Sequence, residues 1–457
     1  MMSLKKIIQT AILIVIRQRV FIPLIAWVVG HRLIDFDLAQ ASRAGAGRKI
    51  LALNSIRYGQ DLKLINGQGE FMVKTLDPAI QSWINALFIG GLTGEKVRKM
   101  GARAFLKSSD PENRRVVLKQ ELYLESLISR ICRRCGIEAI VTCTFYYAQD
   151  QVWMSAAENA GIPFVVLHKE CMKDAAIIPE MTKQYATGEI YFRFKGTRIA
   201  VYNDNEKKCQ VDSGIVSGDK VVVTGCPRTD ALFKRRIRGD FPEPEKCVTF
   251  FSFRHLIGGL RGPELKTGFS SDGNSGAARL FAESHAAFAK TAMLHPDWEF
   301  VIKPKWLKNW GPFIEKTILE ELGINLADIP NLRVDVSEPA QSLIDRSKVV
   351  VGLNSTTVIE ARVAGRDVIV PVFEEAEGRH WDRIYFRKYF DTDFLVARSG
   401  KHQQELIEKA MFSTKPILDN KDDRLYREFF GYTDGKCTDR VVALLKEEID
   451  LKHRAIT

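Results

Sequence analysis

Three consecutive hydroxyl side chains, Ser355–Thr357, follow Asn354 and lie between two short apolar runs of the chain. These runs, Lys348–Val351 and Val368–Val370, have the composition of buried parallel strands, and the residues between them predict a helix that Gly365 ends. A helix that begins at the carboxyl end of a parallel strand presents hydroxyls and unpaired N–H groups to a ligand. We expect this loop, including Asn354, to hold the phosphate of a nucleotide-activated donor. The alternative is that its hydroxyls only cap the helix.

Three titratable residues, His168, Lys169 and Glu170, follow another apolar run, Pro163–Leu167. Loops after the strands of a doubly wound domain are where such folds place their chemistry. Histidine titrates near neutral pH, so we expect His168 to be the general base toward an acceptor hydroxyl, with Glu170 orienting it or acting itself. If His168 is buried away from the site, Asp61 is the next candidate. The alternative is an ordinary polar loop.

A third group of candidates lies in the segment KVVVTGCPRTDALF, residues 220–233. The β-branched run Val221–Val223 predicts a strand. After it, Gly225 allows a close approach of the backbone, and Arg228 is suited to clamping a phosphate or a carboxylate. Asp230 is a candidate cap for the next helix.

The segments at residues 220–233 and 348–372 together resemble the GT-B-fold transferases of bacterial surface polysaccharides. The nearest group is that of the CDP-glycerol glycerophosphotransferases and capsule biosynthesis transferases. Its members carry a V-T-G-x-P-R-x-D segment near the end of the first domain and a serine-rich loop before a helix in the second. The non-hydrolysing UDP-N-acetylglucosamine 2-epimerases share the fold and a related V-T-G-N segment. The similarity follows the order of elements over residues 45–400, and only these two segments match residue by residue.

The resemblance implies an α/β fold with two Rossmann-like parallel-sheet domains facing a cleft, braced by C-terminal helices. It further implies that Arg228 and Lys303 help to hold the donor phosphate. Acidic residues after the strand that ends the 348–372 segment often hold the donor sugar, which points to Glu374 and Glu375; a solvated acidic loop is the alternative. Where relatives often have a His-Pro pair, this chain has Lys305-Trp306. No Asp-x-Asp pair follows a predicted strand, so we expect neither a metal nor another cofactor.

Length and composition suit a folded protein of two domains. The chain has 457 residues, of which 46% are hydrophobic and 27% charged. Its net charge of +11 favours anionic partners such as nucleotide phosphates, acidic glycans or a membrane surface, and no motif indicates nucleic acid. We divide the chain into an apolar and basic N-terminal segment (1–44), an acceptor-side domain (45–240), a linker (241–246), a donor-binding domain (247–400) and C-terminal helices (401–457).

Two apolar runs near the N-terminus, Ile7–Ile16 and Val20–Val29, are separated by Arg17 and Arg19. Each has about 10 residues, whereas a helix that spans a bilayer needs about 20. We therefore expect a cytoplasmic protein, with this basic segment either on the inner face of the plasma membrane or packed on the protein itself. Eight scattered cysteines agree with a reducing compartment.

Two further segments complete the predicted secondary structure. The spacing of apolar residues over 71–104 predicts helix. The glycine-rich loop 254–275 contains Arg254, His255 and Arg261 and is a candidate lid over the donor or the acceptor.

These features predict a transferase that moves a sugar or a glycerol-phosphate-type group from a nucleotide-activated donor. The acceptor would be a glycan or a lipid-linked chain of a capsule, a lipopolysaccharide or a teichoic-acid-like polymer. One alternative is a sugar-nucleotide 2-epimerase, which needs several carboxylates in its cleft. Another is a non-catalytic GT-B-like protein of polysaccharide assembly.

Overall fold

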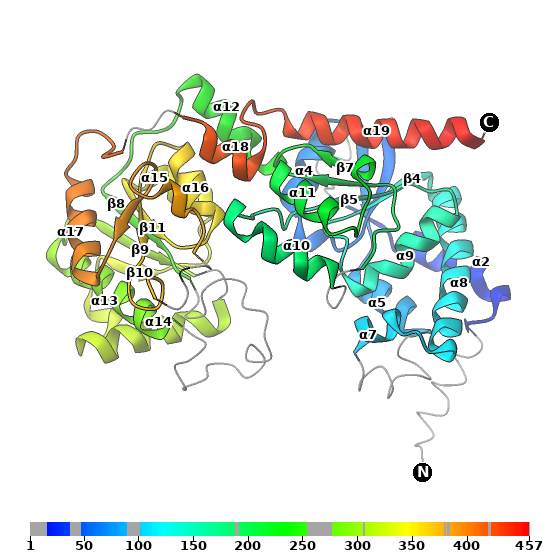
Figure 1. Cartoon of the computed structure of the whole chain (residues 1–457), viewed down its shortest axis with the longest axis horizontal. Coiled ribbons are helices and arrows are strands. Elements are labelled where there is room, and N and C mark those ends of the chain that lie inside the picture. The colour runs from blue at the N-terminus through cyan, green and yellow to red at the C-terminus, as the bar shows by residue number, and fades with distance from the viewer. Residues whose placement is uncertain are drawn as a thin grey trace, which may run out of the picture. The chain divides into compact units, whose positions relative to one another are not determined.

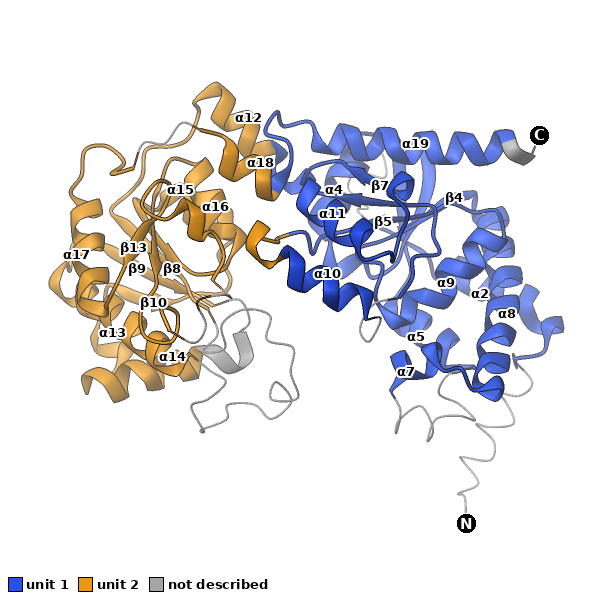
Figure 2. Cartoon of the chain, viewed as in Figure 1, with its two compact units in different colours: residues 1–171, 178–230, 430–457 blue, residues 172–177, 231–429 orange. Residues whose placement is uncertain are grey.

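The computed structural model describes residues 16–36, 47–88, 101–187, 192–253, 277–304, 307–378, 381, 384–418 and 422–456. The candidate lid at 254–275 and the pair Lys305-Trp306 lie outside these residues, as does most of the first apolar run. The chain forms two compact units, shown in Figure 2. Unit 1 contains residues 1–171, 178–230 and 430–457, and unit 2 contains residues 172–177 and 231–429.

A seven-stranded sheet forms the centre of unit 1, with strand order β1-β3-β2-β4-β5-β6-β7. Strand β1 pairs antiparallel with β3, and the other neighbours pair in parallel. The order reverses between β2 and β4, and open α/β sheets bind ligands beyond the carboxyl ends of strands at such a point. The strands are β1 (Ile34–Asp35), β2 (Arg48–Ala52), β3 (Phe71–Thr75), β4 (Ile137–Thr142), β5 (Phe164–Leu167), β6 (Arg198–Val201) and β7 (Val221–Val223).

Helices cover this sheet, and the long C-terminal helix α19 runs along it (Figure 1). Leu445 and Ile449 of α19 share a buried cluster with Ile50 of β2 and Val141 of β4. The helices of unit 1 are α2 (Ile22–His31), α4 (Gly59–Gly67), α5 (Pro78–Ala86), α7 (Ala102–Lys107), α8 (Pro111–Cys135), α9 (Ala148–Asn159), α10 (Ile178–Ala186), α11 (Asp204–Asp212) and α19 (Cys437–Ile456). Short 3-10 turns include η2 (Ser55–Arg57) and η5 (Pro227–Thr229).

The prediction of continuous helix over residues 71–104 is wrong at its start. Phe71–Thr75 is strand β3, which pairs in parallel with β2. Its residues alternate in burial, with Phe71 and Val73 in the core, as expected of a strand with one covered face. Five residues are too few to separate this period of two from the helical spacing that follows.

Unit 2 is built on a six-stranded parallel sheet, with strand order β10-β9-β8-β11-β12-β13. Here the order reverses between β8 and β11. The strands are β8 (Cys247–Phe251), β9 (Glu299–Lys303), β10 (Leu332–Val334), β11 (Val349–Gly352), β12 (Asp367–Pro371) and β13 (Leu395–Ala397). The predicted fold class, two domains each built on a doubly wound and almost wholly parallel sheet, is confirmed.

The helices of unit 2 follow its strands in chain order. Helix α13 packs against α14 and α17, and α15 packs against α16. They are α12 (Asp230–Arg238), α13 (Ala278–Leu294), α14 (Leu307–Leu322), α15 (Ala340–Arg346), α16 (Thr356–Val363), α17 (Gly400–Met411) and α18 (Arg424–Phe430).

The chain passes from one unit to the other at places other than the expected linker, residues 241–246. The division falls between Asp230 and Ala231, directly after the V-T-G-C-P-R-T-D segment. The segment 241–246 packs on unit 2, where the Pro242 carbonyl accepts a hydrogen bond from Arg366 at 2.8 Å. Helices α17 and α18 belong to unit 2, whereas α19 belongs to unit 1. Over the described part of the chain, no helix is long and apolar enough to cross a membrane.

Candidate functional site

The hydroxyl loop of unit 2 has the capping geometry that its sequence predicts. Ser355 is the N-cap of α16, and its Oγ accepts a hydrogen bond from the Thr357 amide at 3.3 Å. The Ser355 and Thr357 hydroxyls lie 2.7 Å apart. Asn354 adopts a left-handed conformation, with φ of 50°, and its Oδ1 accepts from the Tyr385 amide at 2.8 Å. The loop is therefore fixed from both sides, and both hydroxyls lie at the positive end of the helix.

This loop lies at the point where the strand order of unit 2 reverses. Strand β11 pairs with β8, and Gly352 faces Phe251 in the register. The next residue after β8, Ser252, has its Oγ 2.9 Å from Nε2 of His285. The polar residues that follow β8 and β11 thus lie at the carboxyl ends of neighbouring strands, the position at which doubly wound sheets bind nucleotides.

The pair of Ser252 and His285 was not predicted from the sequence. Ser252 follows strand β8 and His285 lies in the middle of helix α13, and no local sequence pattern links two such positions. Nδ1 of His285 lies 2.7 Å from the Phe281 carbonyl, to which it must donate, so Nε2 accepts the Ser252 proton. Burial lowers the pKa of His285 to about 4, which keeps the ring neutral. The Ser252 oxygen, whose proton is directed to His285, therefore keeps lone pairs that can accept a hydrogen bond from a hydroxyl or an N–H group.

Lys303 ends strand β9, on the far side of β8 from the hydroxyl loop. The two strands β9 and β11 are about 10 Å apart, twice the usual spacing. The Lys303 ammonium donates to the Val336 carbonyl at 3.2 Å, toward β10. Burial lowers the pKa of Lys303, while Asp335 and Glu338 act in the opposite direction. The structure therefore does not bring this ammonium to Ser355.

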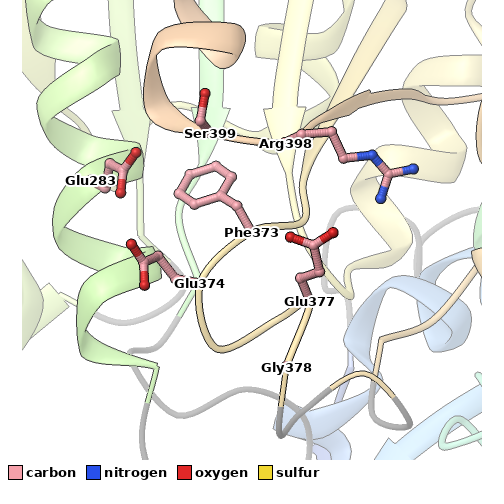
Figure 3. Close-up of a pocket in the computed structure, with 7 residues that line it drawn as sticks. All are labelled: Glu283, Phe373, Glu374, Glu377, Gly378, Arg398 and Ser399. Carbon is pink, nitrogen blue, oxygen red and sulfur yellow. The ribbon is translucent and has the colours of Figure 1, made fainter.

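The acidic residues after β12 line a hollow of about 480 Å³ in unit 2. Figure 3 shows Glu374 and Glu377 on either side of Phe373, with Glu283 contributed by α13. Glu374 is in the left-handed region, with φ of 48°, where a non-glycine residue is strained. The full lining consists of Glu283, Phe373, Glu374, Glu377, Gly378, Arg398 and Ser399.

Glu375 does not line this hollow, although the sequence grouped it with Glu374. Its two oxygens accept hydrogen bonds from the backbone amides of Arg279 at 3.1 Å and Leu280 at 2.8 Å. These amides open helix α13, where a carboxylate satisfies unpaired N–H groups and complements the helix dipole. Glu375 is thus a helix cap supplied by a distant segment.

A second hollow, of about 400 Å³, lies in unit 1. Four cationic side chains and one carboxylate line it, from loops after three strands and from the first turns of α4. The lining consists of Ile56, Arg57, Tyr58, Gly59, Gln60, Asp61, Lys63, Lys169 and Arg228. Arg228, which we expected at the donor phosphate, therefore lines the hollow of unit 1 together with residues that follow β2 and β5.

Neutral groups hold the cations of this hollow in place. Arg57 donates to the Tyr147 hydroxyl at 3.0 Å, and its guanidinium carbon lies 4.8 Å from the centre of that ring. The Lys169 ammonium donates to the Arg57 carbonyl at 2.9 Å. Arg228 lies over the Tyr202 ring at 5.7 Å. The contacts of Arg57 and Lys169 orient these two charges without neutralising them.

Asp61 is the one carboxylate among these cations. Its side chain is buried, with 5% exposed, and it accepts a hydrogen bond from the Arg228 backbone amide. Its Oδ1 has no hydrogen-bond partner among the described residues. Burial raises the pKa of the Asp61 carboxyl, and the charges of Arg228 and Lys169 oppose that rise. This oxygen is itself buried, and Asp61 lines the hollow beside the cations.

His168 occupies a different environment from the one expected of a base. Its side chain is fully buried, between the rings of Phe145 and Tyr146, and Nε2 lies 3.2 Å from Glu206 Oε1. Glu206 also accepts from the Tyr185 hydroxyl at 3.1 Å. A general base must lie within hydrogen-bond reach of its proton donor. His168 is not among the residues that line the hollow of unit 1, whereas Asp61 is, so Asp61 becomes the next candidate. Glu170 is exposed and does not line the hollow.

Gly225 and Asp230 connect the V-T-G-C-P-R-T-D segment to the C-terminal helix. A Cβ on Gly225, whose φ is 80°, would lie 2.4 Å from Cys437 Sγ. The absence of a side chain at Gly225 therefore makes room for Cys437 of the same chain and not for a ligand. Asp230 accepts from the amides of Cys437 at 2.8 Å and Thr438 at 2.7 Å, so it caps α19 and not α12.

No protein-family model and no curated protein matches this chain. Similar solved structures include the UDP-GlcNAc 2-epimerase from Neisseria meningitidis bound to UDP-GlcNAc. Its sequence is 13% identical, the match covers 87% of this chain and 100% of that chain, and the TM-score is 0.48. A variant of the wall teichoic acid polymerase TagF has 9% identity, 98% coverage of both chains and a TM-score of 0.48. A glycosyltransferase from Rickettsia africae ESF-5 has 12% identity, 89% and 98% coverage and a TM-score of 0.41.

These structures include both groups that the two sequence segments resemble. Their identities and TM-scores are too low to transfer a ligand, a residue role or a reaction to this chain.

Proposed function

We propose that this protein is a transferase that moves a sugar or a glycerol-phosphate-type group from a nucleotide-activated donor to an acceptor hydroxyl. The observation that carries the proposal is the hydroxyl-bearing N-terminus of α16 at the point where the strand order of unit 2 reverses. Phosphates bind at such helix termini because free N–H groups and the helix dipole favour negative charge. The resemblance of the two sequence segments to surface-polysaccharide transferases supports the same reading.

Unit 2 would bind the donor. Ser355 and Thr357 would contact its phosphate, and the dipole of α16 would stabilise the charge that develops on the leaving nucleotide. Ser252, whose proton is engaged by His285, would accept a hydrogen bond from the donor. Glu374 would accept hydrogen bonds from hydroxyls of the transferred group, because it lines the neighbouring hollow.

Unit 1 would bind the acceptor, with Asp61 as its base. As the acceptor oxygen bonds to the electrophilic atom of the donor, the bond from that atom to the nucleotide phosphate breaks. The nucleotide leaves with the electron pair, and the acceptor proton moves to Asp61. Stabilisation of the leaving phosphate comes from chain groups, the α16 amides and the hydroxyls of Ser355 and Thr357.

The exposed face of α2 supports a place at the membrane surface, where a lipid-linked acceptor would lie. Ile22, Ile25 and Val29 of this helix are buried, and α2 packs on α8. Its other face exposes Leu24 and Trp27, at 57% and 48%. An apolar face flanked by basic residues is typical of helices that bind anionic lipid surfaces.

A 2-epimerase is the second candidate, because three carboxylates, Glu283, Glu374 and Glu377, line one hollow of unit 2. The two functions differ in a measurable way. Epimerisation at C2 of a UDP-N-acetylhexosamine in D₂O exchanges the C2 proton for deuterium, whereas transfer leaves it in place. Proton NMR of UDP-GlcNAc incubated with the protein decides between them.

A thermal-shift screen with CMP, CDP, UDP and GDP tests the main proposal. At least one nucleotide should raise the melting temperature, because a ligand that binds only the folded state stabilises it. A variant with Ser355→Gly and Thr357→Val should lose this shift, since it lacks both hydroxyls but retains an acceptable N-cap. The proposal fails if no nucleotide stabilises the wild type, or if the variant responds as the wild type does.

A further inference from the structure

We propose that Asp174 is a positioning residue of the hydroxyl loop and that it acts through two consecutive backbone amides of unit 2. The Phe386 amide donates to Oδ2 of Asp174 at 3.0 Å. The Tyr385 amide donates to Oδ1 of Asn354 at 2.8 Å, and Asn354 directly precedes the N-cap Ser355. The inference deepens the proposed function and rests on it only in taking the hydroxyl loop as the phosphate site.

Asp174 belongs to a short segment of unit 2 that lies in the sequence between two parts of unit 1. Residues 172–177 are in unit 2, whereas strand β5 before them and helix α10 after them are in unit 1. Figure 2 shows the segment in the colour of unit 2, directly before α10. The Asp174 side chain is buried, with 4% exposed. Its Oδ1 accepts from the Ala176 amide at 2.9 Å, while Oδ2 serves the Phe386 amide.

The conformation of Phe386 depends on this acceptor. Its φ of 70° lies in the left-handed region, which a bulky residue adopts only where the surrounding structure enforces it. The ring is fully buried, with its centre 5.6 Å from that of Phe394 and 4.9 Å from that of Phe429. These rings hold the side chain, and Asp174 holds the amide. Without Asp174 the N–H group would be a buried donor that has lost its acceptor, and the backbone would move to regain one.

The same stretch of backbone supports the hydroxyl loop. Asn354 is itself left-handed, with φ of 50°, and its side chain accepts from the Tyr385 amide. It sets the direction in which the chain leaves β11, and therefore the position of Ser355 and Thr357 at the start of α16. A displacement of the peptide at 385–386 removes this support. The groups that face a phosphate then lose the fixed geometry on which charge-assisted hydrogen bonds depend.

Hydrogen exchange of the full-length protein, followed by mass spectrometry, tests this positioning without a ligand. In Asp174→Ala, exchange should be faster by about tenfold or more in peptides that cover residues 384–390 and residues 353–358. The amides of Tyr385 and Phe386 report on the first stretch and that of Val358 on the second, because each is hydrogen-bonded in the wild type.

Asp367→Ala is the matched control. Asp367 is also a buried aspartate of unit 2, with 3% exposed, and it accepts a distant backbone amide, that of Ile417, at 2.8 Å. It begins strand β12 at the amino edge of the sheet, whereas the hydroxyl loop follows the carboxyl end of β11. The control should lower the melting temperature to a similar extent and leave exchange over residues 353–358 as in the wild type.

Nucleotide affinity gives a second readout, which a merely structural role would not move. Asp174→Ala should weaken binding by about tenfold or more for whichever of CMP, CDP, UDP and GDP stabilises the wild type, and Asp367→Ala should not. Added to Ser355→Gly and Thr357→Val, Asp174→Ala should weaken binding little further, because it acts through the same loop. Independent effects would multiply instead.

Asp174→Asn carries the test if Asp174→Ala does not fold. Asparagine has the size of aspartate but a single acceptor oxygen, so it can serve one of the two amides that Asp174 binds. Exchange over residues 353–358 and nucleotide affinity should therefore change in the same direction as in the alanine variant, and by less.

Two results would overturn the inference. One is that exchange over residues 353–358 in the folded Asp174 variants stays at the rate of the wild type, or rises equally in the Asp367→Ala control. The other is that Asp174→Ala and the loop substitutions weaken nucleotide binding independently. If the exchange rates change as expected but none of the four nucleotides binds the wild type, the positioning of the loop by Asp174 stands and the proposed transferase fails.

Discussion

The side-chain amide of Asn54 donates to the carboxylate of Asp150 at 2.7 Å, although 96 positions of sequence separate the two residues. Gln81 and Thr142 donate to the same carboxylate, at 2.7 and 2.8 Å. Asn54 is in the left-handed region, with φ of 54°, where the side-chain contact stabilises the turn. The contact ties the loop after β2 to the start of α9, and this loop carries Arg57 into the hollow of unit 1. Asp150 is therefore a positioning residue for that arginine.

Burial of Asp150 predicts how the stability of unit 1 depends on pH. Desolvation raises the pKa of Asp150 to about 6, above its ordinary value of 3.8, while its three hydrogen-bond donors oppose the rise. A carboxyl whose pKa is higher in the folded state stabilises the fold at low pH, and this stability is lost as the pH rises from about 4 through about 6. The loss amounts to about 3 kcal/mol in all, of which about 1 kcal/mol falls between pH 5 and pH 7.

Urea unfolding of the wild type and of Asp150→Asn at pH 5 and pH 7 measures this contribution. The wild type should lose about 1 kcal/mol more than the variant between the two pH values, because asparagine does not titrate. Other titrating groups are common to both proteins and cancel in the difference. Equal pH dependence of the two proteins would mean that Asp150 ionises normally in the fold.

Burial of His168 predicts a loss of stability on substitution, with little effect on the chemistry. His168→Ala removes one of the partners of the buried Glu206, which also accepts from Tyr185 and Gln210, and should lower the free energy of unfolding by about 3 kcal/mol. Replacing both residues by leucine should restore much of this loss, because no charge is then left buried. Turnover of the folded fraction should stay near that of the wild type. A stable His168→Ala protein whose turnover is lower by 100-fold would instead reinstate His168 as the base.

The hydroxyl loop predicts a specific loss of nucleotide binding. Replacing Ser355 by glycine and Thr357 by valine removes two hydrogen bonds to a phosphate and should weaken nucleotide binding by about 1 to 3 kcal/mol. The free energy of unfolding should fall by only a few tenths of a kcal/mol for the glycine, which is tolerated at an N-cap. Titration of the nucleotide identified by thermal shift measures the first quantity, and urea unfolding measures the second. Undiminished nucleotide affinity in the folded variant would exclude this loop from the donor site.

Local features of the molecule were predictable from the sequence, and long-range ones were not. Ser355 was identified as a possible cap and Val221–Val223 as a strand, because capping and β-branched runs are properties of adjacent residues. The capping of α19 by Asp230 depends on an amide 207 residues further along the chain. The same holds for Glu375, whose partners Arg279 and Leu280 lie in another helix.

The choice between His168 and Asp61 as the candidate base depends on a related long-range effect. His168 directly follows strand β5, and Asp61 lies in the first turn of α4, which follows β2. Whether such a residue faces solvent depends on what packs above it: the aromatic rings of Phe145 and Tyr146 cover His168, while Asp61 borders a hollow. Strand position therefore selects candidates, and packing of distant segments decides among them.

The exposed face of α2 predicts reversible binding to anionic membranes. Leu24 and Trp27 are half-exposed on a helix that has no acidic residue, and the exposed Arg19 and Arg32 flank it. Binding should therefore combine insertion of apolar side chains with attraction of the arginines to anionic headgroups. Vesicles of phosphatidylglycerol and phosphatidylcholine should carry the protein upward in flotation, and high salt should release much of it.

Replacing Leu24 and Trp27 by glutamine tests this surface directly. The double variant should bind anionic vesicles at least tenfold more weakly, since each lost side chain removes about 1 to 2 kcal/mol of apolar burial. Ile237→Gln is the control, because Ile237 is an apolar side chain, 66% exposed, on α12 of unit 2, away from the exposed face of α2. It should float as the wild type does. If the α2 variant also floats as the wild type does, or if neutral vesicles bind the protein as well as anionic ones, this face of α2 does not contact the membrane.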